Sequence, residues 1–146
     1  MKLHELIVKV AETGLHSQKS DGSMVPGQNG PYNDIETPVR NTSHWAITFV
    51  KAFQLTSKEK FKKAALACTE YLSGQQARPY GKTFWHRESD SKDKCNGLIG
   101  QAWSIESICV VSNAFNIPEL ADLATEIFHL HPFNSKKKLW NRVEID

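Results

Sequence analysis

The chain has 146 residues and a formal net charge of +2, which suits one domain and excludes the basic surplus of a nucleic-acid-binding protein. Hydrophobic residues make up 40% and charged residues 23%, as in ordinary globular proteins, and no run approaches the roughly 20 apolar residues of a membrane span. Three irregularly spaced cysteines and an N-terminus without a signal-peptide core predict reduced thiols, a cytoplasmic location and no membrane partner.

The N-terminal segment has apolar residues three and four positions apart, from Leu3 to Ala11, which predicts an amphipathic helix. Gly14 is expected to loosen or end this helix. Glycines and prolines are dense between residues 18 and 40, so this stretch is predicted to be a loop. Loops of this length are mostly functional or disordered, and the apolar residues within it favour an ordered one.

The rest of the chain repeats one pattern twice, in which a long loop leads into an apolar helix, a short turn and a more charged helix. The apolar helices are predicted to be buried on nearly all sides, and the charged ones to bury a single stripe. Because long and short connections alternate, all long loops should lie at one end of the helical stack. The predicted helices span residues 41–54, 57–73, 96–115 and 118–131, the second long loop spans 74–95, and residues 136–146 are expected to be extended.

Two segments resemble the α/α toroids, in which helical hairpins close into a ring of inner and outer helices. The run Gln18, Asp21, Gly22, Ser23 is similar to a Q-x-x-D-G-S-aromatic turn of such proteins, with Met24 in place of the aromatic residue. The run 96–103 (NGLIGQAW) resembles glycine-led inner helices of six-hairpin carbohydrate-active enzymes, such as unsaturated glucuronyl hydrolases and relatives of N-acylglucosamine 2-epimerase. The resemblance implies an all-α fold of stacked helical hairpins.

Complete toroids of this class have about twice as many helices, so the resemblance implies that this chain forms roughly half of one. We therefore expect a single helical domain over residues 1–146, as an incomplete α/α toroid or a fragment of a larger one. An open half-ring exposes apolar surface on its inner helices, and large exposed apolar patches usually mark an interface. This predicts self-association.

One candidate site lies where the first long loop meets the helix that follows it. Sugar sites need aromatic faces for the apolar side of a ring, with carboxylates, arginine or histidine for hydroxyl and acidic groups. The alternative is structural: Arg40 would pair with Glu36 or Asp34 to hold the loop, and Trp45 would fill the core. The residues of this cluster are Tyr32, Asp34, Glu36, Arg40, His44 and Trp45.

The second candidate site is the run from Trp85 through His86 and Arg87 to Glu88. His86 and Glu88 are two positions apart, so in an extended segment their side chains would point the same way. Burial could then bring their pKa values toward neutrality for acid–base roles. In the alternative, Phe84 and Trp85 belong to a hairpin packed on the rim, with the charges in solvent.

The resemblance implies a carbohydrate-active domain of the hydrolase, lyase or epimerase type, and these residues fit one that acts on or binds an acidic or amino sugar at the long-loop end. The acid–base candidates are His44, His86, Glu36 and Glu88, and the substrate-binding candidates are Tyr32, Asp34, Arg40, Trp45, Trp85, Arg87 and Gln101. Neither a metal-ligand motif nor a cofactor motif is present, so no metal and no cofactor are expected. The alternative function is a non-catalytic helical-repeat module that binds a protein partner.

Overall fold

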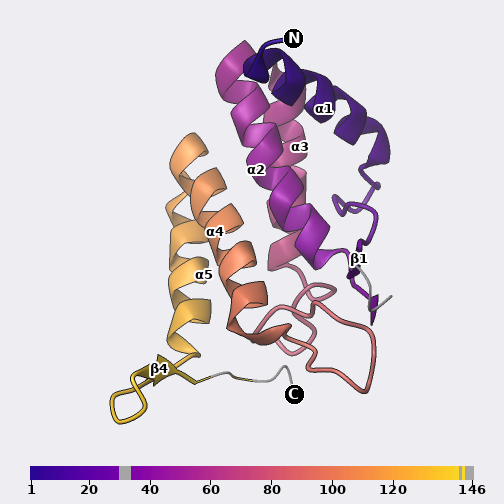
Figure 1. Ribbon diagram of the computed structural model, residues 1–146. Helices are drawn as coiled ribbons and strands as arrows, with labels where there is room; N and C mark the ends of the chain where they lie inside the picture. The colour runs from indigo at the N-terminus through magenta and orange to yellow at the C-terminus, as the bar shows by residue number, and fades with distance from the viewer. Residues whose placement is uncertain (30–33, 142, 144–146) are drawn as a thin grey trace.

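The computed structural model describes residues 1–29, 34–141 and 143. It is mainly helical, as Figure 1 shows, with two short antiparallel strand pairs beside the helices. Four helices begin and end within two residues of the predicted bounds, and the all-α prediction is confirmed. The helices are α1 (Leu3–Ser17), α2 (Val39–Thr56), α3 (Glu59–Ser73), α4 (Gly97–Phe115) and α5 (Pro118–His129); the strands are β1 (Gln28–Asn29), β2 (Asp34–Ile35), β3 (Phe133–Asn134) and β4 (Leu139–Trp140).

The helices run alternately up and down, so the long loops gather at one end of the molecule (Figure 1). Short turns join α2 to α3 and α4 to α5 at the opposite end. Helices α2 and α4 pack against each other, while α3 lies against α2 and α5 against α4. The N-terminal ends of α2 and α4 therefore meet at the loop end, where the sequence places the candidate residues.

The core has two clusters of buried residues, and both include residues of α2, α3 and α4. Phe49 and Phe61 are fully buried in the part between α1, α2 and α3. Phe84 is buried in the other part, so the second long loop contributes to the core and is held by it. Each such aromatic side chain contributes about 2 kcal/mol or more through burial alone.

Gly14 does not end the first helix, and that prediction was wrong. Helix α1 continues to Ser17, and Gly14 is buried within it. A β-carbon at this position would lie 2.1 Å from Cζ3 of Trp45, closer than any real contact. The glycine is present because the indole of Trp45 lies directly on the α1 backbone.

The prediction that the apolar helices are buried on nearly all sides was also wrong for α4. One stripe of this helix, at spacings of three and four residues, is exposed, and no element within the described part of the chain covers it. Apolar periodicity alone cannot show that a covering element is missing. The stripe consists of Ile99, Ala102, Glu106, Cys109 and Asn113.

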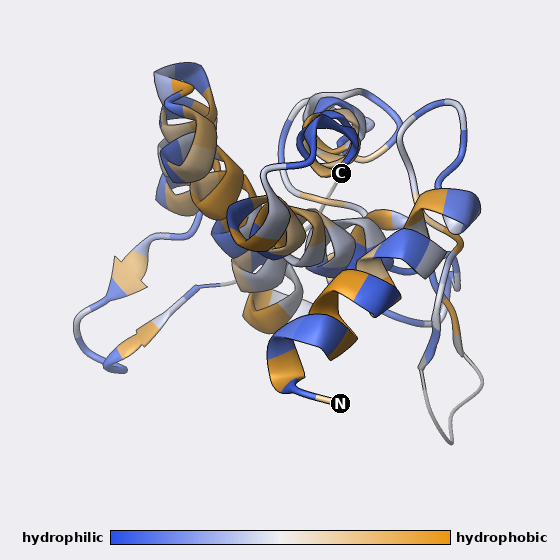
Figure 2. Ribbon diagram, turned by 90° about the horizontal axis from the view of Figure 1, so that it is seen from above, coloured by the Kyte–Doolittle hydropathy of each residue, from blue (hydrophilic) through white to orange (hydrophobic). Residues whose placement is uncertain are grey.

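The C-terminal segment forms a β-hairpin of β3 and β4, in which Phe133 pairs with Trp140. Of the residues 136–146 predicted to be extended, Leu139 and Trp140 form a strand, residues 136–138 form the hairpin turn, and 142 and 144–146 lie outside the described residues. Figure 2 shows the hairpin standing beside the helices. Among the described residues, no helix has the length and apolar character needed to cross a membrane.

Candidate functional site

The two long loops are joined by backbone pairing at the loop end. Glu36 and Arg87 form an antiparallel bridge. The N–H of Thr37 donates to the carbonyl of His86 at 3.0 Å, and the N–H of Glu88 donates to the carbonyl of Ile35 at 3.1 Å. Residues that face each other in such a bridge project to the same side. The predicted convergence of the two loops is therefore found at residues 35–37 and 86–88.

Arg40 is held in place by a buried carboxylate. The side chain of Glu36 is 1% exposed, and its Oε1 lies 2.9 Å from Nη1 of Arg40, four residues further along the chain. The guanidinium carbon of Arg40 lies 6.0 Å from the ring centroid of Trp103, within cation–π range. The structural alternative, in which Arg40 pairs with Glu36, is thus observed. In this pairing the side chain of Arg40 as a whole remains 23% exposed.

His44 lies one turn further along α2 and also contacts Trp103, with ring centroids 5.5 Å apart. Its imidazole has a lowered pKa because of partial burial and the positive charge of Arg40, while the carboxylate of Glu106 opposes that shift. The neutral form is therefore favoured near pH 7. Arg40 and His44 from α2, with Trp103 and Glu106 from α4, form what we call the Arg40 face.

His86 lies beneath this face and is 1% exposed. Its Nε2 is 3.4 Å from the hydroxyl of Ser104, which is 3.0 Å from the hydroxyl of Ser43. Burial, followed by the positive charges of Arg40 and Arg87, lowers the pKa of His86 to about 3. The imidazole is therefore neutral at pH 7 and links the second loop to the contact between α2 and α4.

Arg87 and Glu88 differ sharply in environment. Arg87 forms a 2.7 Å ion pair with Asp93, whose other carboxylate oxygen accepts the N–H of Gly97 at 2.7 Å. Asp93 thus caps the N-terminus of α4, where a negative charge is favourable. Glu88 is exposed, whereas His86 is buried, so the two side chains do not share the single site expected from their spacing.

Three other predicted residues lie apart from the Arg40 face. Trp45 packs on Gly14 and against Phe49 in the core, as the structural alternative proposed. Trp85 stands beside Tyr80 in a shallow pocket of about 110 Å³. Gln101 is 1% exposed and holds the second loop by three hydrogen bonds, to the N–H and carbonyl of Phe84 and the carbonyl of Cys95.

The structure describes two further predicted residues only in part or not at all. Tyr32 lies outside the described residues, and Asp34 is described only through its backbone, which pairs with Asn29 in the first strand pair. Their assignment as substrate-binding residues stays a prediction.

Trp103 and Glu106 were not among the predicted site residues. In the sequence Trp103 is one apolar residue of a helix that is apolar almost throughout, so nothing distinguishes it from core. The available signal was spacing: Trp103 and Glu106 are three residues apart and Arg40 and His44 four, so each pair lies on one face of its helix.

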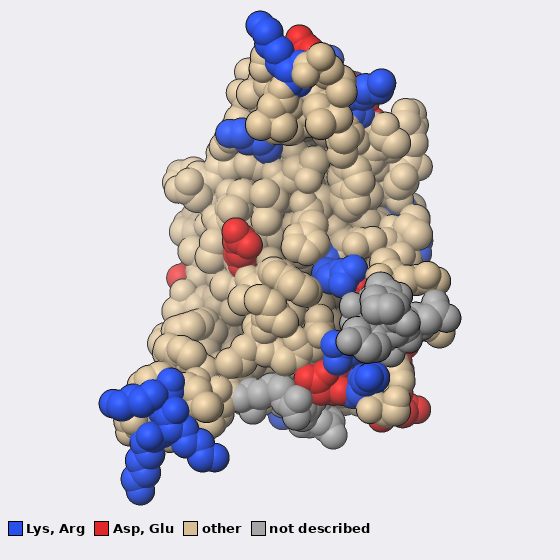
Figure 3. Space-filling view, in the orientation of Figure 1, with Lys and Arg blue, Asp and Glu red and all other residues tan. Residues whose placement is uncertain are grey.

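The Arg40 face brings together a fixed cation, a neutral imidazole, a carboxylate and an aromatic ring. Figure 3 shows charged side chains at both ends of the molecule and few over the middle of the side in view. A guanidinium, with its several N–H donors, suits a carboxylate or other anionic group. An indole suits the apolar face of a sugar ring.

Comparison with known proteins shows a similarity to part of a longer protein. The chain is 51% identical over 144 residues to archaeal glycosylation protein Q of Haloferax volcanii, an alignment that covers 99% of this chain and 39% of the relative. The chain therefore corresponds to well under half of that protein's length. No protein-family model matches the sequence, and no solved structure matches it.

Proposed function

We propose that this chain is a carbohydrate-active part of a glycosylation-related protein and that it binds an acidic sugar at the Arg40 face. The name of the relative supports a role connected with glycosylation. The residue types at the Arg40 face support a saccharide ligand, because they combine a ring-stacking group with a cation and hydrogen-bonding groups.

The observation that carries this proposal is the fixed position of Arg40. A buried Glu36 side chain restrains the guanidinium at 2.9 Å while leaving part of it at the surface beside Trp103. An arginine whose rotamer is already set loses less entropy when it binds an anionic group. A sugar carboxylate on Arg40 would place its ring within reach of Trp103 and His44.

Within this proposal the predicted acid–base residues take different roles. His44, with its lowered pKa, is the proton acceptor on the Arg40 face, and the negative charge of the Glu106 carboxylate acts on its imidazole. Glu36 positions Arg40, and His86 supports the α2–α4 contact from beneath. Whether the reaction is hydrolysis, elimination or epimerisation, it would require a proton transfer of this kind.

The proposal is tested by titrating the purified chain with sodium glucuronate and following the indole N–H signal of Trp103 by NMR. Loss of a charge-assisted hydrogen bond costs about 1.5–3 kcal/mol, so Arg40→Gln is expected to weaken binding about 10- to 150-fold. Lys51→Gln, on an exposed position of the same helix, serves as the matched control and is expected to bind normally.

Arg40→Gln leaves Glu36 buried without its cation, so a second variant is needed that does not disturb the fold. His44→Gln meets this need because His44 is exposed, with His16→Gln on α1 as its control. If glucuronate moves no signal of the Arg40 face, or if Arg40→Gln and His44→Gln both bind as the unchanged protein does, the proposal fails.

The alternative function, a helical module that binds protein, has one specific observation in its favour. An apolar pocket of about 320 Å³ lies between α4, α5 and β4, lined by Ala102, Ile105, Phe128 and Trp140 among others. Its lining residue Ala102 belongs to the uncovered stripe of α4, on which Ile99 is also exposed. The occupant proposed for this surface is a second copy of the chain, in keeping with the predicted self-association.

Light scattering during gel filtration over a range of concentrations tests this alternative. A concentration-dependent dimer that Ile99→Lys converts to a monomer would support it. A monomer at every concentration would refute self-association through this surface.

A further inference from the structure

The apolar pocket between α4, α5 and β4 has the size and the lining of a small-molecule site. Its volume is about 320 Å³, within the range of such sites. Helix α4 supplies aliphatic side chains to its walls, and α5 and β4 supply aromatic rings. The apolar lining residues are Leu98, Ala102, Ile105, Phe128 and Trp140.

His131 also lines this pocket, and it supplies the observation that points to a ligand. The residue is only 4% exposed, yet neither nitrogen of its ring has a hydrogen-bond partner among the described residues. A buried polar group without a partner is unfavourable unless something else satisfies it. Gln101, the other buried polar residue of the pocket, already makes three hydrogen bonds to the second loop. His131 is therefore the buried polar group that a ligand in the pocket can satisfy.

The imidazole of His131 can accept a hydrogen bond from such a ligand. Burial lowers the pKa of His131, so at pH 7 the neutral ring, with one N–H and one lone pair, is favoured. The backbone of Asn141 opposes this shift, as a carbonyl near the ring N–H does, and it can engage only one of the two nitrogens. The other nitrogen is left to accept from a donor on the ligand.

The surroundings of His131 favour a neutral donor over a charged group. The desolvation that disfavours a protonated imidazole would also penalise an ammonium or a carboxylate placed beside it. The exposed carboxylate of Glu106, another lining residue, would add repulsion for an anion. A hydroxyl group is neutral and donates one hydrogen bond, so it meets both requirements.

The aromatic lining favours a ring as the apolar body of the ligand. The rings of Phe128 and Trp140 have centroids 4.9 Å apart and are tilted by 57°. Both residues are 42% exposed, so a ligand between them and α4 would remove apolar surface from water. An aromatic ligand would also gain edge-to-face contacts with these rings.

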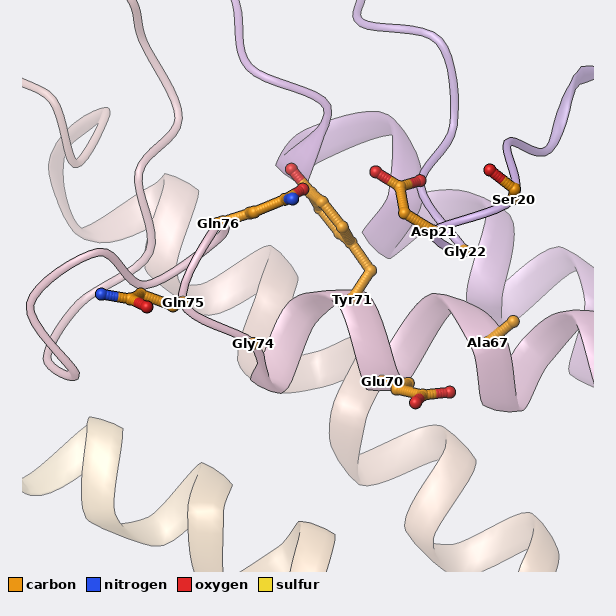
Figure 4. Close-up of a pocket in the computed structure, with 9 residues that line it drawn as sticks. All are labelled: Ser20, Asp21, Gly22, Ala67, Glu70, Tyr71, Gly74, Gln75 and Gln76. Atoms are coloured by element: carbon orange, nitrogen blue, oxygen red, sulfur yellow. The ribbon is translucent and has the colours of Figure 1, made fainter.

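The larger hollow at the end of α3 lacks this combination of features. Its volume is about 450 Å³, and Asp21, Glu70 and Gln76 contribute polar groups to its lining (Figure 4). None of its nine lining residues has a buried side-chain nitrogen or oxygen without a hydrogen-bond partner. Only the apolar pocket therefore joins a volume of this kind to an unsatisfied polar group within the described residues.

We infer that the pocket between α4, α5 and β4 binds a small neutral aromatic alcohol, whose hydroxyl donates to His131 and whose ring lies against Phe128 and Trp140. Such a ligand differs from the acidic sugar proposed for the Arg40 face, and its binding does not depend on that proposal, although Glu106 belongs to both sites. A second copy of the chain would lie on the exposed stripe of α4, whereas the ligand lies inside the pocket.

The test is an NMR titration of the full chain with benzyl alcohol, following the indole N–H of Trp140 and the ring-nitrogen signals of His131. We expect both to shift with saturation, and one ring nitrogen to show the change of a newly accepted hydrogen bond. Ile99→Lys is titrated in parallel and is expected to bind benzyl alcohol. Ile99 is exposed and does not line the pocket, so this variant removes the contact considered for a second copy and leaves the site intact.

Charged analogues test the choice of a neutral ligand. Benzoate and benzylamine carry the same ring as benzyl alcohol, with a carboxylate or an ammonium in place of the neutral group. Both are expected to bind about tenfold more weakly or less, because a charge beside His131 loses its hydration.

A first variant assigns the hydrogen bond to the imidazole. His131→Phe keeps an aromatic ring at this position but removes both nitrogens. It is expected to weaken binding of benzyl alcohol relative to toluene about two- to tenfold, the effect of one hydrogen bond, because toluene has no hydroxyl. His16→Phe, at an exposed position on α1, is the matched control and should leave the ratio of the two affinities unchanged.

A second variant locates the site should His131→Phe unfold. Ala102→Phe places a large side chain in the pocket from an exposed position of α4 and is expected to abolish binding of benzyl alcohol. Ala121→Phe makes the same exchange at an exposed position of α5 that does not line the pocket, and it should bind as the unchanged protein does.

Three results would overturn the inference. The first is the absence of any saturable shift of Trp140 and His131 in both the unchanged protein and Ile99→Lys. The second is an unchanged ratio of affinities for benzyl alcohol and toluene in folded His131→Phe, or undiminished binding by Ala102→Phe. The third is binding of benzoate or benzylamine as tight as that of benzyl alcohol, which would identify a site for a charged group.

Discussion

The buried histidine of the second loop makes the stability of the protein sensitive to mild acid. His86 is neutral in the folded chain, where its pKa is about 3, whereas an unfolded histidine has a pKa near 6.5. Below pH 6.5 the unfolded state therefore binds more protons than the folded state. The stability associated with neutral His86 is therefore complete above about pH 6.5 and is lost as the pH falls below that value.

The magnitude follows from the two pKa values. For a single group with these values, the free energy of unfolding decreases by about 2 kcal/mol between pH 7 and pH 5. His44 and His131, whose pKa values are also lowered, add changes of the same sign. The carboxylates with lowered pKa values change the stability mainly below pH 5. The change between pH 7 and pH 5 therefore reports on the histidines.

Urea unfolding followed by circular dichroism at half-unit steps from pH 7.5 to pH 5 measures the effect. His86→Gln keeps a hydrogen-bonding group near Ser104 but cannot titrate, so its stability should fall by about 2 kcal/mol less over this range than that of the unchanged protein. His16→Gln, at an exposed position, should retain the full decrease. Equal pH dependence in the unchanged protein and in His86→Gln would refute the reasoning, whatever the absolute stabilities.

Three further predictions concern the scaffold. Gly22→Ala should lower the free energy of unfolding by about 2 kcal/mol or more, because Gly22 has a positive φ and lies against α3. Gly81→Ala, also at positive φ but in open space, should lower it by only about 1 kcal/mol, and thermal unfolding of both variants would show the difference. Gln101→Leu should cost about 2–4 kcal/mol in urea unfolding, because it leaves the N–H of a buried loop without its acceptor, and an unchanged midpoint would contradict this account. Brief treatment of the folded protein with iodoacetamide should modify exposed Cys109 and spare Cys68, because the thiol of Cys68 is buried and its pKa is raised to about 12. Equal labelling of the two cysteines in mass spectrometry would contradict this prediction and show that the core opens readily.

The helices were predictable because their apolar residues recur with helical spacing and because glycine, proline and polar residues mark their ends. The start at Pro118 and the break at Ser57 are local signals that tertiary contacts did not override. Gly14 led to a wrong prediction because glycine locally favours the end of a helix. Here it lies within the helix, because the indole of Trp45 leaves no room for a side chain at this position. Such a requirement arises from packing between helices and leaves no mark in the neighbouring sequence.

The candidate site was predictable in place but only partly in composition. The alternation of long and short connections gave the end of the molecule at which residues 36–44 and 85–88 meet. It could not show which side chains turn inward there. His86 and Glu88 are both polar residues in the sequence, yet His86 is buried against Ser104 and Glu88 is exposed. Trp103 required knowledge of which stripe of α4 is left uncovered.

The pairing of the first loop with the second has a consequence for how this region can diversify. The hydrogen bonds that link residues 35–37 to residues 86–88 are mainly between backbone groups, which every residue except proline supplies alike. Exchange of an exposed side chain such as that of Glu88 therefore leaves the connection intact. Side chains at the loop end can therefore be replaced while the backbone link between the two loops is kept.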